Sequence, residues 1–383
     1  MRVAFYAPMK PPDHPAPSGD RRMARLLIAA LKRAGHRVEV ASTFRSYDRS
    51  GDVRRQQRLA EIGQALAGRL LRRYRRRPAA ERPEIWFTYH LYHKAPDWLG
   101  PVVARELRIA YTVAEASFAP KQADGPWSAG HAAAGAAISA ADRIIALNSA
   151  DTPCVAPLLT DSARLVPLKP FIDAAPFARA ADGRDQHRAT LAGAEGIESA
   201  VPWLLVVAMM RAGDKLASYQ ALGRGLARLT DRPWRLLVAG DGPVRVKVEA
   251  AFHAVAPRVH WLGEVGESAL PGICAAADLF VWPAVNEAYG MVFLEAQAAA
   301  VPVVAGRFGG VPDVVADGIT GDLVSPGDDA AFAEAIAVML DDPDRRRAMG
   351  RCARDHVLSG HDIDAAARAL DAAIRNLEPA AAR

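Results

Sequence analysis

Two glutamates eight positions apart, Glu287 and Glu295, lie in the mostly apolar stretch PAVNEAYGMVFLEAQAAA. At about 100° per residue, this spacing leaves an offset of roughly 80° around a helix, so the pair does not share one helix face. We therefore predict that Glu287 lies in a loop and that a helix begins near Tyr289–Gly290, with Glu295 about one turn inside. Free backbone N–H groups at a helix start hold anions. Those expected to do so belong to Gly290, Met291 and Val292.

The helix dipole alone could explain why Glu295 lies near a helix start. A glutamate in the first turns of a helix stabilises it, which explains Glu295 better than Glu287. Two cations, Arg211 and Lys215, follow the apolar run WLLVVAM. Fixed cations at the carboxyl end of a strand suit a diphosphate, and an ordinary pair of surface cations is the alternative.

Two further glycine-containing turns join a strand to a helix. VAGDGP contains Gly240 and Asp241, and APMKPPDHPAPSGDRR places Gly19 at a helix start. A glycine there lets a phosphate approach the backbone, and a simple helix-entry glycine is the alternative. Neither turn is the G-x-G-x-x-G fingerprint of dinucleotide-binding proteins or a Walker A loop.

Short apolar runs rich in β-branched or aromatic residues alternate with helical segments along the whole chain. This alternation predicts an α/β fold with two Rossmann-like, doubly wound parallel-sheet domains. Such sheets bind ligands at the carboxyl ends of their strands, so two sheets facing across a cleft would share one ligand. The predicted strands are 3–8, 36–42, 84–89, 108–114 and 142–148, then 203–209, 234–240, 259–263, 279–284, 301–306 and 320–326.

The length of 383 residues also favours two domains, because one core stops growing near ~250–300 residues. We predict an N-terminal domain over 1–175, a C-terminal domain over 176–357 and a C-terminal helix within 358–383 that could cross back to the first domain. A polar linker is expected over 165–202. Three scattered cysteines, no signal-peptide pattern and no apolar run long enough for a bilayer favour a cytoplasmic protein.

Charge is unevenly distributed. Residues 1–175 contain 27 Lys and Arg against 16 Asp and Glu, whereas the remainder contains 21 against 27, so the first half favours an anionic partner. Residues 53–83 contain ten arginines and two glutamates in a predicted amphipathic helix. That helix either lies on an anionic membrane surface, or docks on the sheet with its arginines solvated. Nucleic acid is not an expected partner, because no nucleic-acid module is visible. The apolar positions of the helix are Leu59, Ile62, Leu66, Leu70 and Tyr74.

Residues 203–355 resemble the nucleotide-binding domain of the GT-B glycosyltransferases, specifically the large retaining family 4 (glycosyl transferases group 1). Five motifs in order carry the resemblance: MMRAGDK, AGDGP, NEAYGMVFLE, AVPVV and GGVPD. The later tracts DGITGDLVSPGD and AMGRCARDHV are also similar. The N-terminal half resembles the family less, mainly through SGDRRMARLLIAALKRAGHRVEV.

The resemblance implies transfer of a sugar, with retention, from a UDP-sugar or GDP-sugar to a glycan, lipid-linked or small-molecule acceptor, as in polysaccharide biosynthesis. It implies no cofactor and no metal, because cations of the chain stabilise the departing diphosphate. The catalytic residues that it implies are Glu287, Arg211 and Lys215. Donor binding would fall to Gly19, Gly240, Asp241, Tyr289, Gly290, Met291, Val292 and Glu295, with Glu295 on the ribose and Gly19 near the phosphate.

The chain departs from the family pattern after the strand AYTVAEAS. Ala114 precedes Glu115 where the family commonly has a histidine that is thought to contact the donor sugar. His90 could occupy nearby space or be a structural histidine, and Asp20 follows Gly19 where a second glycine is common. Two alternatives therefore stay open: a nucleotide-sugar 2-epimerase, and an inactive GT-B-like nucleotide-binding protein.

Overall fold

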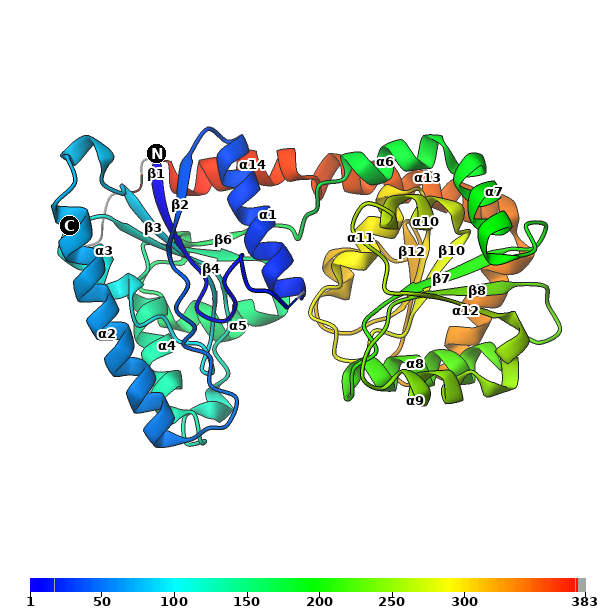
Figure 1. Cartoon of the computed structure of the whole chain (residues 1–383), viewed down its shortest axis with the longest axis horizontal. Helices are drawn as coiled ribbons and strands as arrows, with labels where there is room; N and C mark the ends of the chain where they lie inside the picture. Colours follow the sequence, from blue (N-terminus) through cyan, green and yellow to red (C-terminus); the bar gives the residue numbers. More distant parts are fainter. Residues whose placement is uncertain (17, 376, 378–383) are drawn as a thin grey trace. The chain divides into compact units, whose positions relative to one another are not determined.

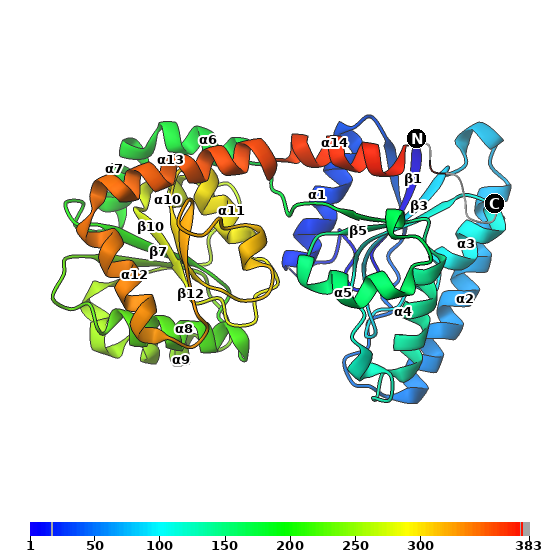
Figure 2. The ribbon, with the colours of Figure 1, turned by 180° about the vertical axis from the view of Figure 1, so that it is seen from behind.

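The computed structural model describes residues 1–16, 18–375 and 377, which form two compact units. The first unit comprises Met1–Lys169 together with helix α14 (Ile363–Ile374), and the second comprises Pro170–Asp362. Each unit is a six-stranded parallel sheet with helices on both faces (Figures 1 and 2). The predicted α/β fold with two doubly wound sheets is confirmed. The units divide after Lys169 and after Asp362, whereas the sequence placed these boundaries at 175 and 357.

The first sheet has the strand order β2-β1-β3-β4-β5-β6. Helices α1 and α14 pack together on one face, and α2, α3 and α4 cover the other (Figure 1). Its strands are β1 (Arg2–Tyr6), β2 (Arg37–Ser42), β3 (Ile85–Leu91), β4 (Ala110–Ala116), β5 (Arg143–Ala146) and β6 (Leu165–Pro167). Its other helices are α1 (Gly19–Arg33), α2 (Val53–Arg75), α3 (Gly100–Leu107), α4 (Ser128–Ala140) and α5 (Thr152–Val155).

The core of the first unit lies between its sheet and helices α2–α4. Tyr6 and Trp86 of the central strands are fully buried there beside Tyr74 of α2 and Val103 of α3. Near-continuous apolar strands of this kind are expected where helices cover both faces of a parallel sheet. The core therefore holds β1, β3 and β4 rigidly, and their carboxyl ends form one edge of the sheet.

Helix α2 ends at Arg75, short of the predicted 83. Its buried face includes Ala67, Leu70 and Tyr74 and contacts α3 and α4, while Leu59 is only partly buried. The apolar face is therefore occupied by other helices, and the arginines point away from the core. This packing fits the docking interpretation of the helix, and the membrane contact stays a prediction.

The second sheet has the order β12-β11-β10-β7-β8-β9. Helices α8, α9 and α12 cover one face, and α6, α7, α10, α11 and α13 the other (Figures 1 and 2). Its strands are β7 (Trp203–Val207), β8 (Arg235–Ala239), β9 (Val259–Gly263), β10 (Leu279–Trp282), β11 (Val303–Gly306) and β12 (Gly321–Val324). Its helices are α6 (Ala175–Asp182), α7 (Arg184–Glu195), α8 (Asp214–Leu226), α9 (Arg245–Ala251), α10 (Leu270–Ala276), α11 (Met291–Ala298), α12 (Asp329–Asp341) and α13 (Pro343–Gly360).

The expected linker over 165–202 is wrong in part, because it contains regular elements. β6 completes the first sheet, and α6 and α7 belong to the second unit. Helix α7 has no fully buried residue. It therefore lacks the apolar stripe by which an amphipathic helix is found in a sequence. Arginine side chains attach it to the sheet instead.

Strand order reverses once in each sheet, between β1 and β3 in the first unit and between β7 and β10 in the second. In open α/β sheets, ligands bind outside the carboxyl ends of the strands at such a reversal. The loops that follow β1, β3, β7 and β10 are therefore the first places to examine. No helix among the described residues combines the length and apolar character that crossing a membrane requires.

Candidate functional site

The loops after β7, β8 and β10 carry the residues predicted to act on a donor. β7 pairs with both β8 and β10, all in parallel, so the three loops meet at one edge of the second sheet. Arg211 and Lys215 follow β7, Gly240 follows β8, and Glu287 and Gly290 follow β10. Residues that are far apart in the sequence therefore lie near one another where the strand order reverses.

Lys215 and Glu287 form an ion pair across this edge. The side chains are 31% and 18% exposed, so water reaches the lysine while the carboxylate is largely covered. The Lys215 ammonium also lies 5.5 Å from the ring centroid of Trp282, within the range of a cation–π contact. Two of the three predicted catalytic residues are therefore in direct contact.

The loop after β10 is held in an unusual backbone conformation. Ala284 and Asn286 have φ values of 57° and 51°, and a non-glycine residue in this region costs about 1–3 kcal/mol. Hydrogen bonds to α8 hold the loop: Asn286 Nδ2 donates to Asp214 Oδ1 at 3.0 Å, and the Val285 N–H donates to Ser218 Oγ at 3.0 Å. The loop that carries Glu287 is thus fixed to the helix that carries Lys215.

Helix α11 begins at Met291, next to the predicted start, and Gly290 is its N-cap with a φ of 70°. No side chain caps this end, so its first N–H groups point outward without a partner inside the helix. A Cβ at Gly290 would lie 2.7 Å from the Phe293 ring, so only glycine fits. Glu295 is buried one turn further on, and Tyr289 is buried before the cap.

The turn after β8 packs against the loop after β7. Gly240 has a φ of 149°, and a Cβ there would lie 1.9 Å from the Ala208 carbonyl oxygen. Asp241 is exposed, and its carboxylate accepts bonds from the Gly242 N–H at 2.7 Å and from Arg245 at 3.0 Å, which lowers its pKa.

Arg211, the third predicted catalytic residue, does not take part in the ion pair between Lys215 and Glu287. The same is true of Asp241. The Arg211 side chain is exposed and makes no ion pair or hydrogen bond within the part of the chain that the structure describes. Asp241 is engaged by Arg245. Neither side chain contacts the Lys215–Glu287 pair, so their predicted roles stay predictions.

Gly19 is the first residue of α1, with open space where its Cβ would be. The N-cap is Ser18, whose hydroxyl accepts the Arg21 N–H at 3.2 Å. Asp20 in the same turn bonds to His90 Nδ1 at 3.0 Å. This contact joins the start of α1 to the end of β3, on both sides of the reversal in the first sheet.

His90 and Glu115 are neighbours on β3 and β4, because Tyr89 pairs with Ala114 and Leu91 with Ala116. Both have left-handed backbones, with φ values of 60° and 58°. Burial lowers the pKa of His90, but the carboxylates of Glu115, Asp20 and Asp151 more than offset it and raise the value to about 9. Burial raises the pKa of Glu115. A protonated imidazole is thus held among carboxylates at the carboxyl edge of the first sheet.

Sequence reasoning gave this cluster too little weight. Asp20 was noted only as a departure from a glycine pattern, and His90 as a structural histidine or a substitute. Ala114 lies fully buried in β4, so its position contributes no polar group to this edge. The available signal was that His90 and Glu115 come at the carboxyl ends of adjacent predicted strands.

Comparison with known proteins agrees with this geometry. Residues 202–342 match the family model described as glycosyl transferases group 1. A D-inositol 3-phosphate glycosyltransferase of Corynebacterium kroppenstedtii is 36% identical over 162 residues, which are 39% of this chain and 36% of that protein. The match thus spans about a third of the length of the curated relative.

Solved structures resemble the whole chain. A glycosyltransferase from Rickettsia africae has a TM-score of 0.73 at 15% identity, covering 98% of this chain and 99% of its own. Anabaena HepE in complex with UDP has a TM-score of 0.71 at 15% identity, covering 97% and 99%. The same Anabaena protein has been crystallised with UDP-glucose. At these identities the likeness shows the fold.

The family match lies in the unit that carries the candidate site. The strand order, the loops that meet at the reversal and the matched segment all lie in the second unit. Residues 202–342 match the glycosyl transferases group 1 family model, and the two doubly wound sheets have the fold of the GT-B glycosyltransferases.

Proposed function

We propose that this protein is a glycosyltransferase that moves a sugar from a nucleoside-diphosphate donor to a hydroxyl acceptor with retention of configuration. The observation that carries the proposal is the convergence of Lys215, Glu287 and the uncapped start of α11 where the strand order of the second sheet reverses. This edge offers a cation, outward N–H groups and a carboxylate, which are the groups needed to hold a diphosphate and a sugar hydroxyl.

The donor diphosphate would lie against the N–H groups at the start of α11. Lys215 would then exchange part of its contact with Glu287 for the phosphate oxygens, and Glu287 would accept hydrogen bonds from sugar hydroxyls. Glu295, one turn inside α11, would bond the ribose. UDP is the first nucleotide to test, because a structural relative carries UDP in its crystal structure.

In the reaction, the bond between the anomeric carbon and the diphosphate oxygen breaks, and the acceptor oxygen forms a new bond to that carbon. The acceptor hydroxyl proton passes to a donor phosphate oxygen as the nucleoside diphosphate leaves. Positive charge fixed at Lys215 and the partial charge of the helix start stabilise the negative charge that develops on the diphosphate. Arg211, exposed beside them, would add to it.

The acceptor would bind to the first unit. Asp20, His90 and Glu115 lie at the carboxyl edge of its sheet, where carboxylates can accept hydrogen bonds from acceptor hydroxyls. A glycan, a lipid-linked saccharide or a small polyol would each present such hydroxyls.

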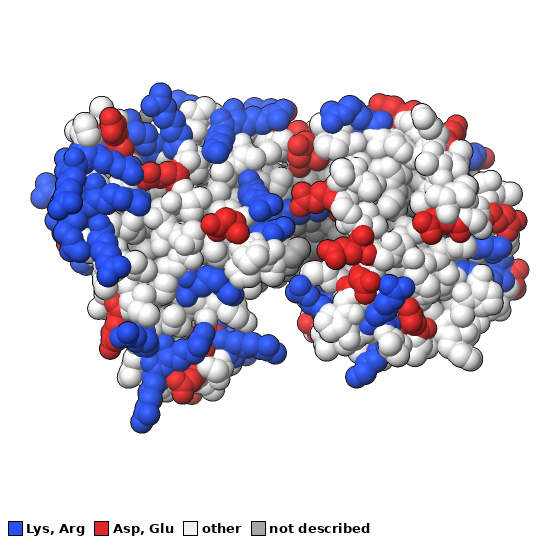
Figure 3. Space-filling view, viewed as in Figure 1, with Lys and Arg blue, Asp and Glu red and all other residues white. Residues whose placement is uncertain are grey.

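Helix α2 supports a proposal of contact with an anionic membrane. Arg69, Arg72 and Arg76 follow one another at three and four residues and so share a face. All three are exposed, and no carboxylate among the described residues pairs with them. Figure 3 shows Lys and Arg side chains gathered over the end of the first unit where α2 ends. Each such cation near an anionic surface contributes about 1 kcal/mol.

The function can be tested by incubating the protein with a panel of UDP- and GDP-sugars, with and without a lipid and glycan extract of its host. Acceptor-dependent release of nucleoside diphosphate, lost in Lys215→Ala and Glu295→Ala, is the expected result. Donor turnover that needs no acceptor would favour a 2-epimerase instead. Nucleotide binding without turnover of any donor would favour an inactive binding protein.

A further inference from the structure

The second unit contains a basic pocket at the edge of its sheet opposite to the candidate site. It has a volume of about 540 Å³ and lies between α7, α13 and the segments that precede β10 and β11. Because these segments lead into the strands, the pocket is at the amino ends of the sheet, whereas Lys215 and Glu287 are at the carboxyl ends. The residues that matter here are Arg184, Arg188, Asp278, Arg346, Arg347 and Arg351.

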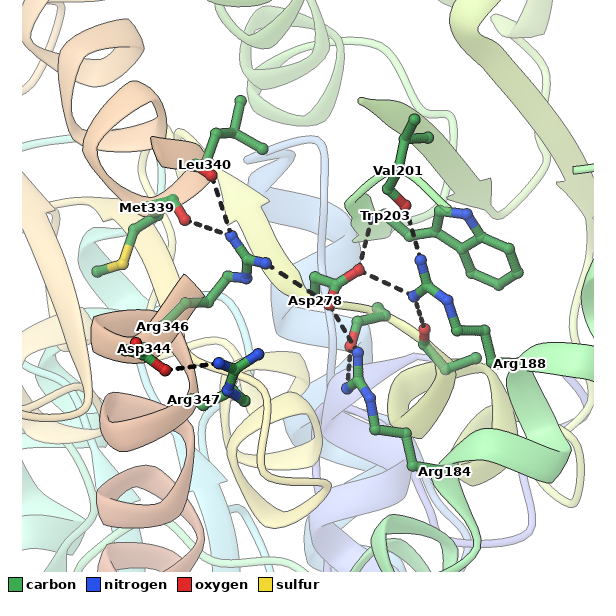
Figure 4. Close-up of polar contacts among 12 residues, drawn as sticks. Arg184, Arg188, Val201, Trp203, Asp278, Met339, Leu340, Asp344, Arg346 and Arg347 are labelled. Atoms are coloured by element: carbon green, nitrogen blue, oxygen red, sulfur yellow. Dashed lines mark hydrogen bonds and ion pairs between the residues drawn. The ribbon is translucent and has the colours of Figure 1, made fainter. Parts of the chain in front are cut away.

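Asp278 is the centre of an inner network (Figure 4). Its carboxylate accepts bonds from Arg184 at 2.7 Å and Arg188 at 2.8 Å, and from the Trp203 N–H at 2.8 Å. Arg346 approaches the same carboxylate at 4.0 Å. All three guanidinium groups also donate to backbone carbonyls of neighbouring segments. Three cations are thus fixed in place around one carboxylate.

Two more arginines of α13 line the rim of the pocket. Arg347 is 64% exposed and pairs with Asp344 at its own helix start. Arg351 is exposed and makes no ion pair or hydrogen bond with any residue that the structure describes. These two lie four residues apart, where like charges on a helix repel each other. Besides Asp278, the one other acid lining the pocket is Asp185 among the described residues, so positive charge is in excess.

The excess positive charge contributes to the lowered pKa of Arg346. Burial lowers its pKa, and repulsion from Arg184, Arg347 and Arg188 lowers it further, against the attraction of Asp278. An anion entering the pocket would reduce this repulsion.

A purely structural role accounts for part of the cluster only. Arg188 donates to Ser199, Val201 and Ala276 as well as Asp278, so all its donors are used in joining α7 to the sheet. That role does not explain why Arg351 faces the same open pocket without a partner. It also does not explain a concavity of this size beside five cations.

We propose that this pocket is a second ligand site that binds a small phosphate-bearing anion. Planar guanidinium groups match the oxygens of phosphate in pairs, and the volume falls in the range of roughly 300–1,000 Å³ that small-molecule sites have. The positive charge of the fixed inner arginines would attract the phosphate, and Arg347 and Arg351 would donate to its oxygens from the rim. The proposal does not depend on the proposed transferase activity, because the two sites lie at opposite edges of one sheet.

Thermal unfolding of the full chain at constant ionic strength tests the site. The Lys215→Ala protein serves as parent, so that phosphate at the carboxyl edge does not dominate the response. Pyrophosphate and a sugar phosphate are titrated separately, which distinguishes an inorganic ligand from a phosphomonoester. Arg347→Ala/Arg351→Ala is the test variant. Arg345→Ala is the matched control, because Arg345 is in the same turn of α13 but pairs with Asp322 outside the pocket.

At least one ligand should raise the melting temperature of the parent and of the Arg345→Ala control. Because two charge-assisted contacts are lost, the double variant should bind that ligand roughly tenfold or more weakly. The double variant should itself fold normally, because neither side chain is buried. Equal responses in the double variant and the control, or no response of the parent to either ligand, would overturn the proposal.

Discussion

Replacing Gly290 with alanine tests the geometry on which the donor site depends. Gly290 has a φ of 70°, which costs an L-residue about 1–2 kcal/mol. The new Cβ would also lie 2.7 Å from Phe293 Cε2 and 3.2 Å from Glu287 Cγ. Phe293 is fully buried against Phe280, with ring centroids 5.6 Å apart, so it cannot move cheaply. Such overpacking costs a further ~1–3 kcal/mol.

The sum is a loss of roughly 2–5 kcal/mol, or about 4–20 °C in the melting temperature of a unit of this size. Gly318→Ala is the matched control, because Gly318 has a φ of 73° but nothing within 4 Å of its Cβ. The control should lose only the backbone strain of about 1–2 kcal/mol, or roughly 2–8 °C. Scanning calorimetry measures both. If Gly290→Ala melted no lower than Gly318→Ala, the position of the Phe293 ring under the cap would be wrong.

Three further outcomes are expected. Lys215→Met should lower turnover about 10²-fold or more, as the loss of one fixed transition-state contact does. Its melting temperature should change little, because an ion pair whose lysine is reached by water adds only about 1 kcal/mol. An unchanged rate would show that Lys215 does not act at the site. The His90 pKa is raised to about 9 in the folded protein, so its stabilisation is complete below pH 6.5 and is lost as the pH rises towards 9, by at most about 3 kcal/mol. Urea unfolding at pH 6.5 and at pH 9 should show this decrease in the free energy of unfolding, and the His90→Gln variant should show a smaller decrease. The protein should co-sediment with vesicles that contain anionic lipid, and the Arg69→Ala/Arg72→Ala variant should bind these vesicles roughly 30-fold less tightly. Equal binding of the variant and the unchanged protein would exclude α2 as the contact.

The sheets could be predicted from the sequence because buried parallel strands are continuous apolar runs. Most of the strands have this signature. The edge strand β2 carries Arg37 and Glu39 among its apolar residues, and β6 has three residues, none of them fully buried, within the segment expected to be a linker. Helix α7 was missed for a related reason. Its contacts are made by the long side chains of Arg184 and Arg188, which a hydrophobic pattern does not record.

The candidate site was predictable in part because its residues lie in loops that directly follow strands. The ion pair between Lys215 and Glu287 joins positions 72 residues apart, and the parallel pairing of β7 with β10 brings them together. The sequence around each residue does not indicate which carboxylate pairs with which cation. The contact of Asp20 with His90 and the ring of arginines around Asp278 likewise depend on tertiary structure, and each unites residues from separate helices and strands.

The central claim is that the carboxyl edge of the second sheet binds the diphosphate of a nucleotide donor. Titration calorimetry of UDP and GDP against the full chain tests it most directly, with Lys215→Ala as the test variant and Arg347→Ala as a control at the opposite edge. We predict one site per chain for at least one of the two nucleotides, about tenfold or more weaker in Lys215→Ala and unchanged in Arg347→Ala. Binding of neither nucleotide, or binding that Lys215→Ala leaves undiminished, would contradict the account.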